Sequence, residues 1–293
     1  MLETVTEHLC LLGESPLWDA ASGTIFWVDI LQGEIHAWGG LAQNHRTWKM
    51  KQPIGAIALC TSGRLVGALQ QGFFYINKDN GQLDFIANPE AHLPGNRFND
   101  GKCDPAGRFW AGTMSTAGVP EAGSLYTLER NGSYSRKVAD VSVSNGMAWS
   151  PDASQFYFID TPTRVVVAYD FDVESGVISN KRIVVRIPEN MGKPDGMTID
   201  EEGMLWIALW GGGKVTRWDP ATGRLLHQFT LPVTHVSSCT FGGDDLNDLY
   251  VTTSRVGLNE QALAEQPQAG TLFVLKNCGF RGLPANRFKD QEP

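Results

Sequence analysis

Residues 194–223 read PDGMTIDEEGMLWIALWGGGKVTRWDPATG, and this stretch decides the fold. It contains an apolar strand, a turn, an aromatic strand, a glycine turn and a third strand that ends in another turn. Short β-branched and aromatic runs that alternate with turn residues are typical of antiparallel β structure. The stretch also places Asp195 at the start of a strand that enters the core. Because burying a lone carboxylate is costly, Asp195 must be solvated, paired or metal-bound.

The same pattern recurs along the whole chain. The turn-then-strand runs are SGTIFWVDI (22–30), SGRLVGAL (62–69), AGRFWAGTM (106–114), SQFYFID (154–160), EGMLWIALW (202–210) and LNDLYVTT (246–253). The copies begin near Gly13, Ile54, Asn99, Asn145, Asp195 and Ser237, about 41–50 residues apart. Units of this period predict an all-β, six-bladed β-propeller with blades of four antiparallel strands. A two-domain β-sandwich is the alternative, but it does not explain the repeat.

The two ends of the chain fit the same plan. The strand-like segment ETVTEHLCLL (3–12) precedes the first copy, so we expect the N-terminal strand to complete the last blade and close the ring. Residues 1–293 are then expected to form a single propeller domain. The last residues, about 277–293, are expected to be a polar and loosely held C-terminal tail.

Composition disfavours several classes of partner. The formal charge of −8 argues against binding to nucleic acid. The apolar runs are strand-length, far short of the ~20 residues of a membrane helix, so no membrane association is expected. The N-terminus lacks the basic region of a signal peptide, and the five cysteines are scattered. We therefore expect a cytoplasmic protein with reduced thiols, a monomer or weak homodimer because a closed ring needs no partner.

Equivalent positions of a propeller repeat lie at the same radius around one axis. The innermost strands are predicted to begin at Glu14, Ile54–Gly55, Asn99, Asn145, Asp195 and Ser237–Ser238. Carboxylate and amide oxygens without His or Cys suit a hard divalent cation such as Ca²⁺, Mg²⁺ or Mn²⁺. The pattern therefore predicts that Glu14, Asn145 and Asp195 bind one metal ion. The alternative is that the Asn-Gly and Asp-Gly pairs are ordinary turns.

Other catalytic patterns are weak or missing in the sequence. Arg97, two residues before Asn99, would lie beside the acidic site and favours hydrogen bonds to substrate oxygens. The six histidines have no H-x-x-x-H spacing, which disfavours a histidine-ligated zinc site or a histidine dyad. No G-x-S-x-G elbow or phosphate-binding loop is present.

Several motifs together resemble one family. They are LGESPLWD (12–19), NRFNDGKCDPAGRFWAGTM (96–114), SNGMAWSPD (144–152), PDGMTIDEEGMLWIALWGGG (194–213), SSCTFGGDDLNDLYVTT (237–253) and QPQAGTLFV (266–274). In order and spacing, residues 7–276 resemble the senescence marker protein/regucalcin/gluconolactonase family.

This resemblance implies a six-bladed propeller that hydrolyses sugar-acid lactones, such as gluconolactone, to open-chain aldonic acids. By the same resemblance, Glu14, Asn145 and Asp195 are the metal ligands, Asp195 is also the general base, and Arg97 and Asn99 hold the substrate. The oxygen ligands favour Ca²⁺, although the family is also known with Zn²⁺, Mn²⁺ and Fe²⁺. Segment 113–123 departs from the animal members by being shorter, and Glu121 is left without a role.

Three alternative functions remain open. The first is a calcium-binding regulatory propeller without lactonase activity. The second is an enzyme that cleaves a phosphotriester or a non-sugar lactone in the same pocket. The third is a protein-binding propeller, which would present an exposed patch in place of a polar ion site. The preferred sugar lactone is not specified by the motifs.

Overall fold

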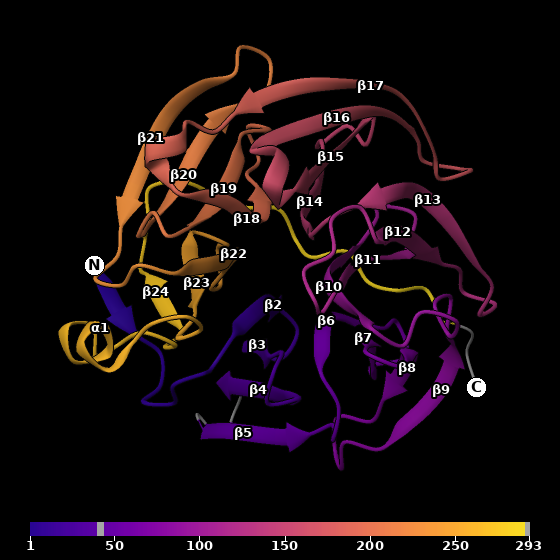
Figure 1. Cartoon of the computed structure of the whole chain (residues 1–293), viewed down its shortest axis with the longest axis horizontal. Coiled ribbons are helices and arrows are strands. Elements are labelled where there is room, and N and C mark those ends of the chain that lie inside the picture. Colours follow the sequence, from indigo (N-terminus) through magenta and orange to yellow (C-terminus); the bar gives the residue numbers. More distant parts are fainter. Residues whose placement is uncertain (40–43, 291–293) are drawn as a thin grey trace.

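The computed structural model describes residues 1–39 and 44–290. Within this part of the chain, six four-stranded antiparallel sheets surround a common axis (Figure 1). The innermost strands are β2 (Gly13–Asp19), β6 (Ile54–Leu59), β10 (Asn96–Cys103), β14 (Ser144–Trp149), β18 (Lys193–Ile199) and β22 (Val236–Gly242). The arrangement confirms the predicted six-bladed β-propeller with four antiparallel strands in each blade.

Each blade adds three strands outside its innermost one. Blade 1 adds β3 (Thr24–Asp29), β4 (Glu34–Gly39) and β5 (Asn44–Lys49), and blade 2 adds β7 (Leu65–Leu69), β8 (Gly72–Ile76) and β9 (Leu83–Ala87). Blade 3 adds β11 (Phe109–Ser115), β12 (Gly123–Leu128) and β13 (Tyr134–Val141), and blade 4 adds β15 (Gln155–Asp160), β16 (Val165–Asp172) and β17 (Val177–Arg186). Blade 5 adds β19 (Leu205–Trp210), β20 (Lys214–Asp219) and β21 (Arg224–Thr230), and blade 6 adds β23 (Asp248–Thr253), β24 (Phe273–Leu275) and β1 (Leu2–Thr4).

The N-terminal strand closes the ring, as predicted. Strand β1 pairs antiparallel with β24, with Leu2 opposite Leu275 and Thr4 opposite Phe273. The strand itself is only Leu2–Thr4, much shorter than the segment 3–12 that the pattern indicates. The short helix α1 (Glu260–Glu265) connects β23 to β24, and two 3₁₀ turns occupy Thr161–Thr163 and Glu189–Met191.

Burial explains why the strands differ in composition. Strands such as β3 and β19, TIFWVD and LWIALW, are almost wholly buried because both faces of the sheet pack against neighbouring blades. The outermost strands β5 and β21 are mostly exposed, and they carry histidine, arginine and lysine. Charged outer strands also discourage edge-to-edge pairing between molecules.

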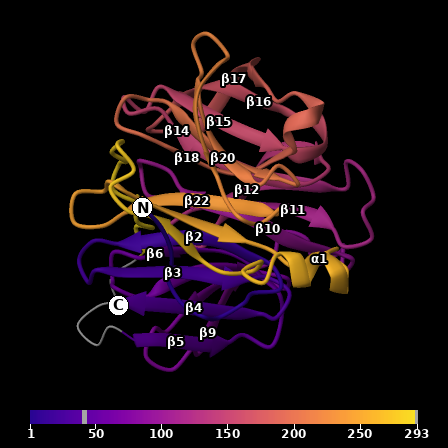
Figure 2. The ribbon, with the colours of Figure 1, turned by 90° about the vertical axis from the view of Figure 1, so that its left-hand side faces the viewer.

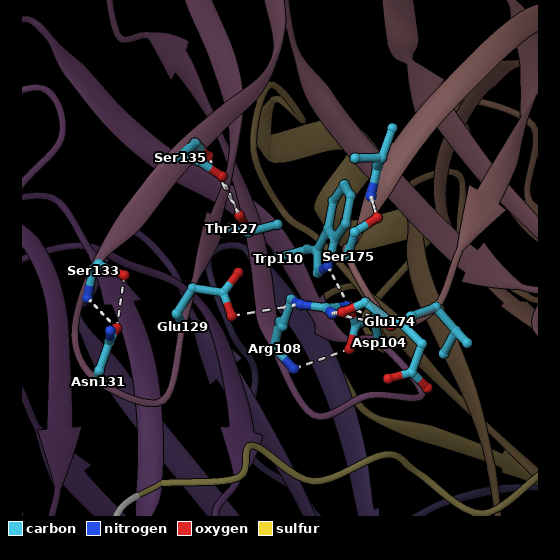
Figure 3. A network of polar contacts seen from close by, with 12 residues as sticks. Asp104, Arg108, Trp110, Thr127, Glu129, Asn131, Ser133, Ser135, Glu174 and Ser175 are labelled. Carbon is cyan, nitrogen blue, oxygen red and sulfur yellow. Dashed lines mark hydrogen bonds and ion pairs between the residues drawn. The ribbon is translucent and has the colours of Figure 1, made fainter.

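In blades 3 and 5, an aspartate side chain stabilises the turn before the aromatic strand through hydrogen bonds. Asp104 accepts hydrogen bonds from the Arg108 backbone (2.9 Å), the Arg108 guanidinium (2.8 Å) and Trp110 Nε1 (2.9 Å) (Figure 3). In blade 5, Asp200 accepts from Met204 N and Trp206 Nε1, both at 2.9 Å. The repeated D-x-x-G-x-x-W spacing is therefore a structural motif that ties the turn to the aromatic strand.

The C-terminal segment is held firmly, so the expectation of a loose tail is wrong for residues 284–290. Phe288 is fully buried, and its backbone N–H donates to Leu59 O at 2.8 Å. The Asp290 carboxylate accepts from Thr61 Oγ1 (2.9 Å) and pairs with Arg64 (2.9 Å). Figure 2 places this end of the chain on the face opposite α1. Residues 291–293 lie outside the described part.

Two further expectations concern the thiols and the membrane. All five cysteines are free, and four of them are buried. Among the described residues, no helix combines the length and the apolar character that crossing a bilayer requires.

Candidate functional site in the central channel

The innermost strands share an irregularity at the place where the predicted site residues lie. In β10, pairing with β11 breaks between Phe98 and Gly101, so Asn99 and Asp100 together face one residue of the partner strand. The pairing breaks likewise after Ser144 in β14, after Pro194 in β18 and after Glu14 in β2. Asn99, Asn145 and Asp195 are each the first residue within the irregularity, so the bulge gives these three the same local geometry. Glu14 differs, because it is the paired residue just before the bulge of β2.

The glycines after Asn145 and Asp195 serve close packing between strands. Both pairs lie inside β14 and β18, and neither glycine has a positive φ, so the turn alternative is wrong. A Cβ atom on Gly146 would lie 2.7 Å from the backbone oxygen of Asp195, which no side chain tolerates. Gly196 is confined in the same way by Ser238 of β22. Small residues here let adjacent inner strands approach and bring Asn145 toward Asp195.

A chain of hydrogen bonds connects three inner strands, β10, β14 and β18, through the 3₁₀ turn at Thr161–Thr163. Arg97 Nη1 donates to Asn99 Oδ1 at 2.7 Å, and Asn99 Nδ2 donates to Asn145 Oδ1 at 3.1 Å. Asn145 Nδ2 donates to Thr161 Oγ1 at 2.8 Å, and Thr161 in turn donates to the Pro194 oxygen at 2.8 Å. These contacts fix both amide side chains and end on the residue before Asp195.

Glu14 and Asp195 are buried acids, and the charge of Asp195 acts on Glu14. Glu14 is 4% exposed and Asp195 is 6% exposed. Burial raises the pKa of Glu14 well above its usual range, and the charges of Asp195 and Asp100 raise it further. Burial also raises the pKa of Asp195, with Asp100 adding to the shift and Arg97 opposing it. Like charges in a low-dielectric channel repel, so the site favours a cation.

Arg97 supplies the positive charge nearest to these acids. It is 8% exposed, and burial lowers its pKa to about 10 while Glu14 and Asp195 oppose that shift, so it stays protonated at neutral pH. Its Nη1 group is bound to Phe98 O and Asn99. Within the described part of the chain, its other N–H groups make no hydrogen bond. They are free to bind oxygen atoms of a ligand.

The donor set fits a hard divalent cation. Glu14 and Asp195 offer carboxylate oxygens, and Asn145 Oδ1 accepts only the Asn99 bond, which leaves one lone pair. Such a set of oxygen donors suits Ca²⁺, Mg²⁺ or Mn²⁺. These three residues would hold the ion, while Asn99 and Arg97 are tied to Asn145 from one side.

The channel beyond these residues is a cavity of about 200 Å³ that the C-terminal segment covers. Asp100 and Lys102 line it from β10, and Leu283 and Pro284 line it from the C-terminal segment. Lys102 Nζ donates to Met197 O at 2.7 Å. The C-terminal segment therefore forms part of the wall at this end of the channel.

Two residues of the channel network were not predicted. Asp100 is 6% exposed and raises the pKa of both Glu14 and Asp195. Thr161 lies in a 3₁₀ turn after β15, outside the repeat position, and joins Asn145 to Pro194. The adjacency of Asp100 to Asn99 was the available signal for the first, whereas Thr161 had none.

The predicted loop and rim residues are placed differently from the channel residues. Glu121 is exposed in the β11–β12 connection, and the structure does not join it to the site network. Trp210, the last residue of β19, stacks on His235 with ring centroids 4.2 Å apart.

Comparison with known proteins assigns the family. The SMP-30/gluconolactonase/LRE-like region matches residues 12–255. The Bacillus subtilis protein YvrE, which carries the name of a sugar lactone lactonase, is 40% identical and covers 94% of each chain. Bovine (Bos taurus) regucalcin is 38% identical over 97% of this chain and 96% of its own. The structure of a calcium-binding protein, regucalcin, from Agrobacterium tumefaciens superposes with a TM-score of 0.93 at 31% identity, covering 98% and 96% of the two chains. This chain belongs to the SMP-30/gluconolactonase/LRE-like family.

Proposed function

We propose that this protein hydrolyses lactones of sugar acids in its central channel, with Asp195 as general base beside a divalent ion held by Glu14, Asn145 and Asp195. The observation that carries the proposal is the pair of buried acids, Glu14 and Asp195, in which the charge of Asp195 raises the pKa of Glu14. The hydrogen-bonded network from Arg97 to Asn145 supports it, since binding an ion alone does not need that arginine. The name of the Bacillus relative points to the same substrate class.

A lactone is a cyclic ester, and its hydrolysis adds water to the carbonyl carbon and breaks the ring C–O bond. A divalent ion bound at the three ligands would polarise the carbonyl group and stabilise the developing negative charge on its oxygen. Asp195 would accept a proton from the attacking water and return one to the ring oxygen as that oxygen leaves.

Arg97 and Asn99 are proposed to orient the sugar ring. The guanidinium is fixed through Nη1 and keeps further donors for hydroxyl or carbonyl oxygens. Because Arg97 is buried among other groups, its guanidinium has little freedom to move, and its remaining N–H donors keep a fixed direction. The oxygen ligands favour Ca²⁺ as the ion, and the similar structure from Agrobacterium tumefaciens is described as calcium-binding.

The direct test is a panel of gluconic, galactonic, arabinonic and xylonic lactones, assayed by proton release at constant pH. A simple aliphatic lactone and a phosphotriester complete the panel. We expect sugar lactones to be opened fastest, the activity to vanish with a chelator and to return when Ca²⁺, Mn²⁺, Mg²⁺ or Zn²⁺ is added back. Hydrolysis of none of the sugar lactones in any metal form would overturn the proposal.

A calcium-binding regulatory protein is the second candidate function, favoured by the relatives named regucalcin.

The substitution Arg97→Ala distinguishes lactone hydrolysis from calcium binding alone. We expect the KM for the best sugar lactone to rise roughly 10- to 100-fold, because hydrogen bonds from a charged donor are lost. The metal affinity, measured by calorimetry, should be unchanged or slightly tighter, because a nearby positive charge is removed. Equal losses of metal binding and substrate binding would contradict the division of roles.

A further inference from the structure

A second group of metal-ligating side chains lies in blade 1, outside the channel. His8 and Cys10 belong to the connection between β1 and β2, and His36 belongs to β4. One potential ligand atom from each residue lies within 4.8 Å of the other two. The absence of an H-x-x-x-H spacing disfavours a histidine-ligated zinc site, but spacing cannot detect this cluster. The cluster forms because the β1–β2 connection contacts strand β4, which is distant in the sequence.

Two nitrogen atoms of this cluster are buried without a partner. His36 is fully buried, and its Nε2 makes no hydrogen bond within the described part of the chain. The Nε2 atom of His8 is likewise buried and unpaired there. Since buried polar atoms are nearly always satisfied, two such atoms beside a buried thiol indicate an occupant that completes them.

The opposite side of the His36 ring is already supported. Its Nδ1 atom lies 3.1 Å from His45 Nε2 and 3.1 Å from Thr47 Oγ1, and the Trp27 ring stacks on it at 5.1 Å. A hydrogen bond on one imidazole nitrogen orients the ring and leaves the other nitrogen for a metal. His45 and Thr47 thus resemble the outer-shell partners of a metal ligand.

The charged neighbours are compatible with a cation. Glu34 Oε2 lies 3.5 Å from His36 Nε2 and is the nearest candidate for a fourth ligand. Asp29 is already bound by the backbone N–H groups of Leu11 (2.6 Å) and Leu12 (3.1 Å). Arg255 lines the surface hollow beside His8 and Glu34. Lys49 Nζ pairs with the other oxygen of Glu34, Oε1, at 3.0 Å, but the Lys49 side chain is largely exposed and can move away when Glu34 binds a metal.

We propose that His8, Cys10 and His36, with Glu34 as fourth ligand, form a structural site for a borderline-soft divalent transition metal, zinc above all. Nitrogen and sulfur donors suit zinc, whereas the oxygen donors of the channel suit calcium. Bonds of about 2.0–2.3 Å place tetrahedral donors roughly 3.3–3.8 Å apart, so the cluster must contract slightly. His8, half-buried on the connection, can supply that movement. The metal would fasten the segment that follows the ring-closing strand β1 to blade 1, and this role is independent of lactone hydrolysis.

The test uses Co²⁺ as a spectroscopic probe in the full-length protein carrying Glu14→Gln, which weakens the channel site. We expect a sulfur-to-cobalt charge-transfer band at one equivalent of Co²⁺, displaced by one equivalent of Zn²⁺. Zn²⁺ should also raise the Tm. Cys10→Ser should abolish both the band and the Tm increase, while Cys239→Ser, which removes the channel thiol, should retain both.

Two variants keep the test decisive should Cys10→Ser fold poorly. His8→Ala changes a half-buried residue and should weaken Co²⁺ binding by more than about 100-fold. His45→Ala should weaken it roughly 10- to 100-fold and keep the band, as expected for an outer-shell partner. Absence of the band from the parent protein, or a band that survives Cys10→Ser or is unaffected by His8→Ala, would overturn the proposal.

Discussion

Asparagine in place of Asp195 is expected to lower kcat for lactone hydrolysis by about 10²- to 10⁴-fold, the usual contribution of a general base. The amide keeps an oxygen that can face the metal, but it cannot accept a proton from water. The variant should therefore still bind metal when metal is supplied in excess. Initial rates at saturating lactone and metal, together with the metal content of the protein, separate loss of the base from loss of the ion.

Asp100→Asn is the matched control for this experiment. Asp100 has the same 6% exposure as Asp195 and lies in the same channel, so both substitutions remove one buried negative charge. The Asp100 carboxylate accepts from the Gly101 N–H at 2.7 Å and is influenced by Lys102, on the side of the covered cavity. We expect its kcat to fall less than about tenfold. Similar losses in both variants would assign the effect to channel charge and remove Asp195 as the base.

The fold was predictable from the sequence because every blade packs both faces of its sheet against neighbouring blades, so the same pattern of strands and turns recurs. Both faces of strands such as β19 are buried, which imposes apolar and aromatic runs. In blades 3 and 5 the turn before the run also carries an aspartate, Asp104 or Asp200, that accepts a hydrogen bond from the tryptophan of the aromatic strand. The repeat does not predict the burial of the C-terminal segment, because this segment is not part of any blade. Phe288 is flanked by polar residues in the sequence, and it is buried because its side chain packs in a core cluster that includes Cys60 and Cys103.

The candidate site was predictable to the extent that it follows the repeat. Asn145 and Asp195 occupy the same position of neighbouring inner strands, so ring geometry alone places them near each other. Asp100 was missed because a bulge puts two consecutive residues where a regular strand would present one. Thr161 and the His8 cluster depend on contacts between segments that share no repeat position, and spacing carries no information about those contacts.

Glutamine in place of Glu14 is expected to affect metal affinity more than catalysis. The substitution removes one of the two negative ligands, and ligand charge is a main determinant of cation affinity, so we expect Kd to rise by at least about 100-fold. Glutamine keeps the size and one oxygen of the side chain. At saturating metal, kcat should therefore recover to within about tenfold of the parent value, unlike Asp195→Asn.

Thermal denaturation gives an independent readout of the same substitution. Without metal, the charges of Glu14 and Asp195 oppose each other in a buried site, so removing one should leave Tm unchanged or raise it. With metal, the parent protein should gain Tm and Glu14→Gln should gain far less, because an ion stabilises only the state that binds it. An equal gain in both proteins would place the ion away from Glu14.

The two variants are interpreted together. If Glu14→Gln loses metal affinity and excess metal restores its kcat, Glu14 is a metal ligand. If Asp195→Asn loses kcat while it retains the metal, Asp195 is the base. A protein that only stores or senses calcium would lose metal affinity in Glu14→Gln but would show no lactone hydrolysis in the parent protein, so these measurements distinguish the two candidate functions.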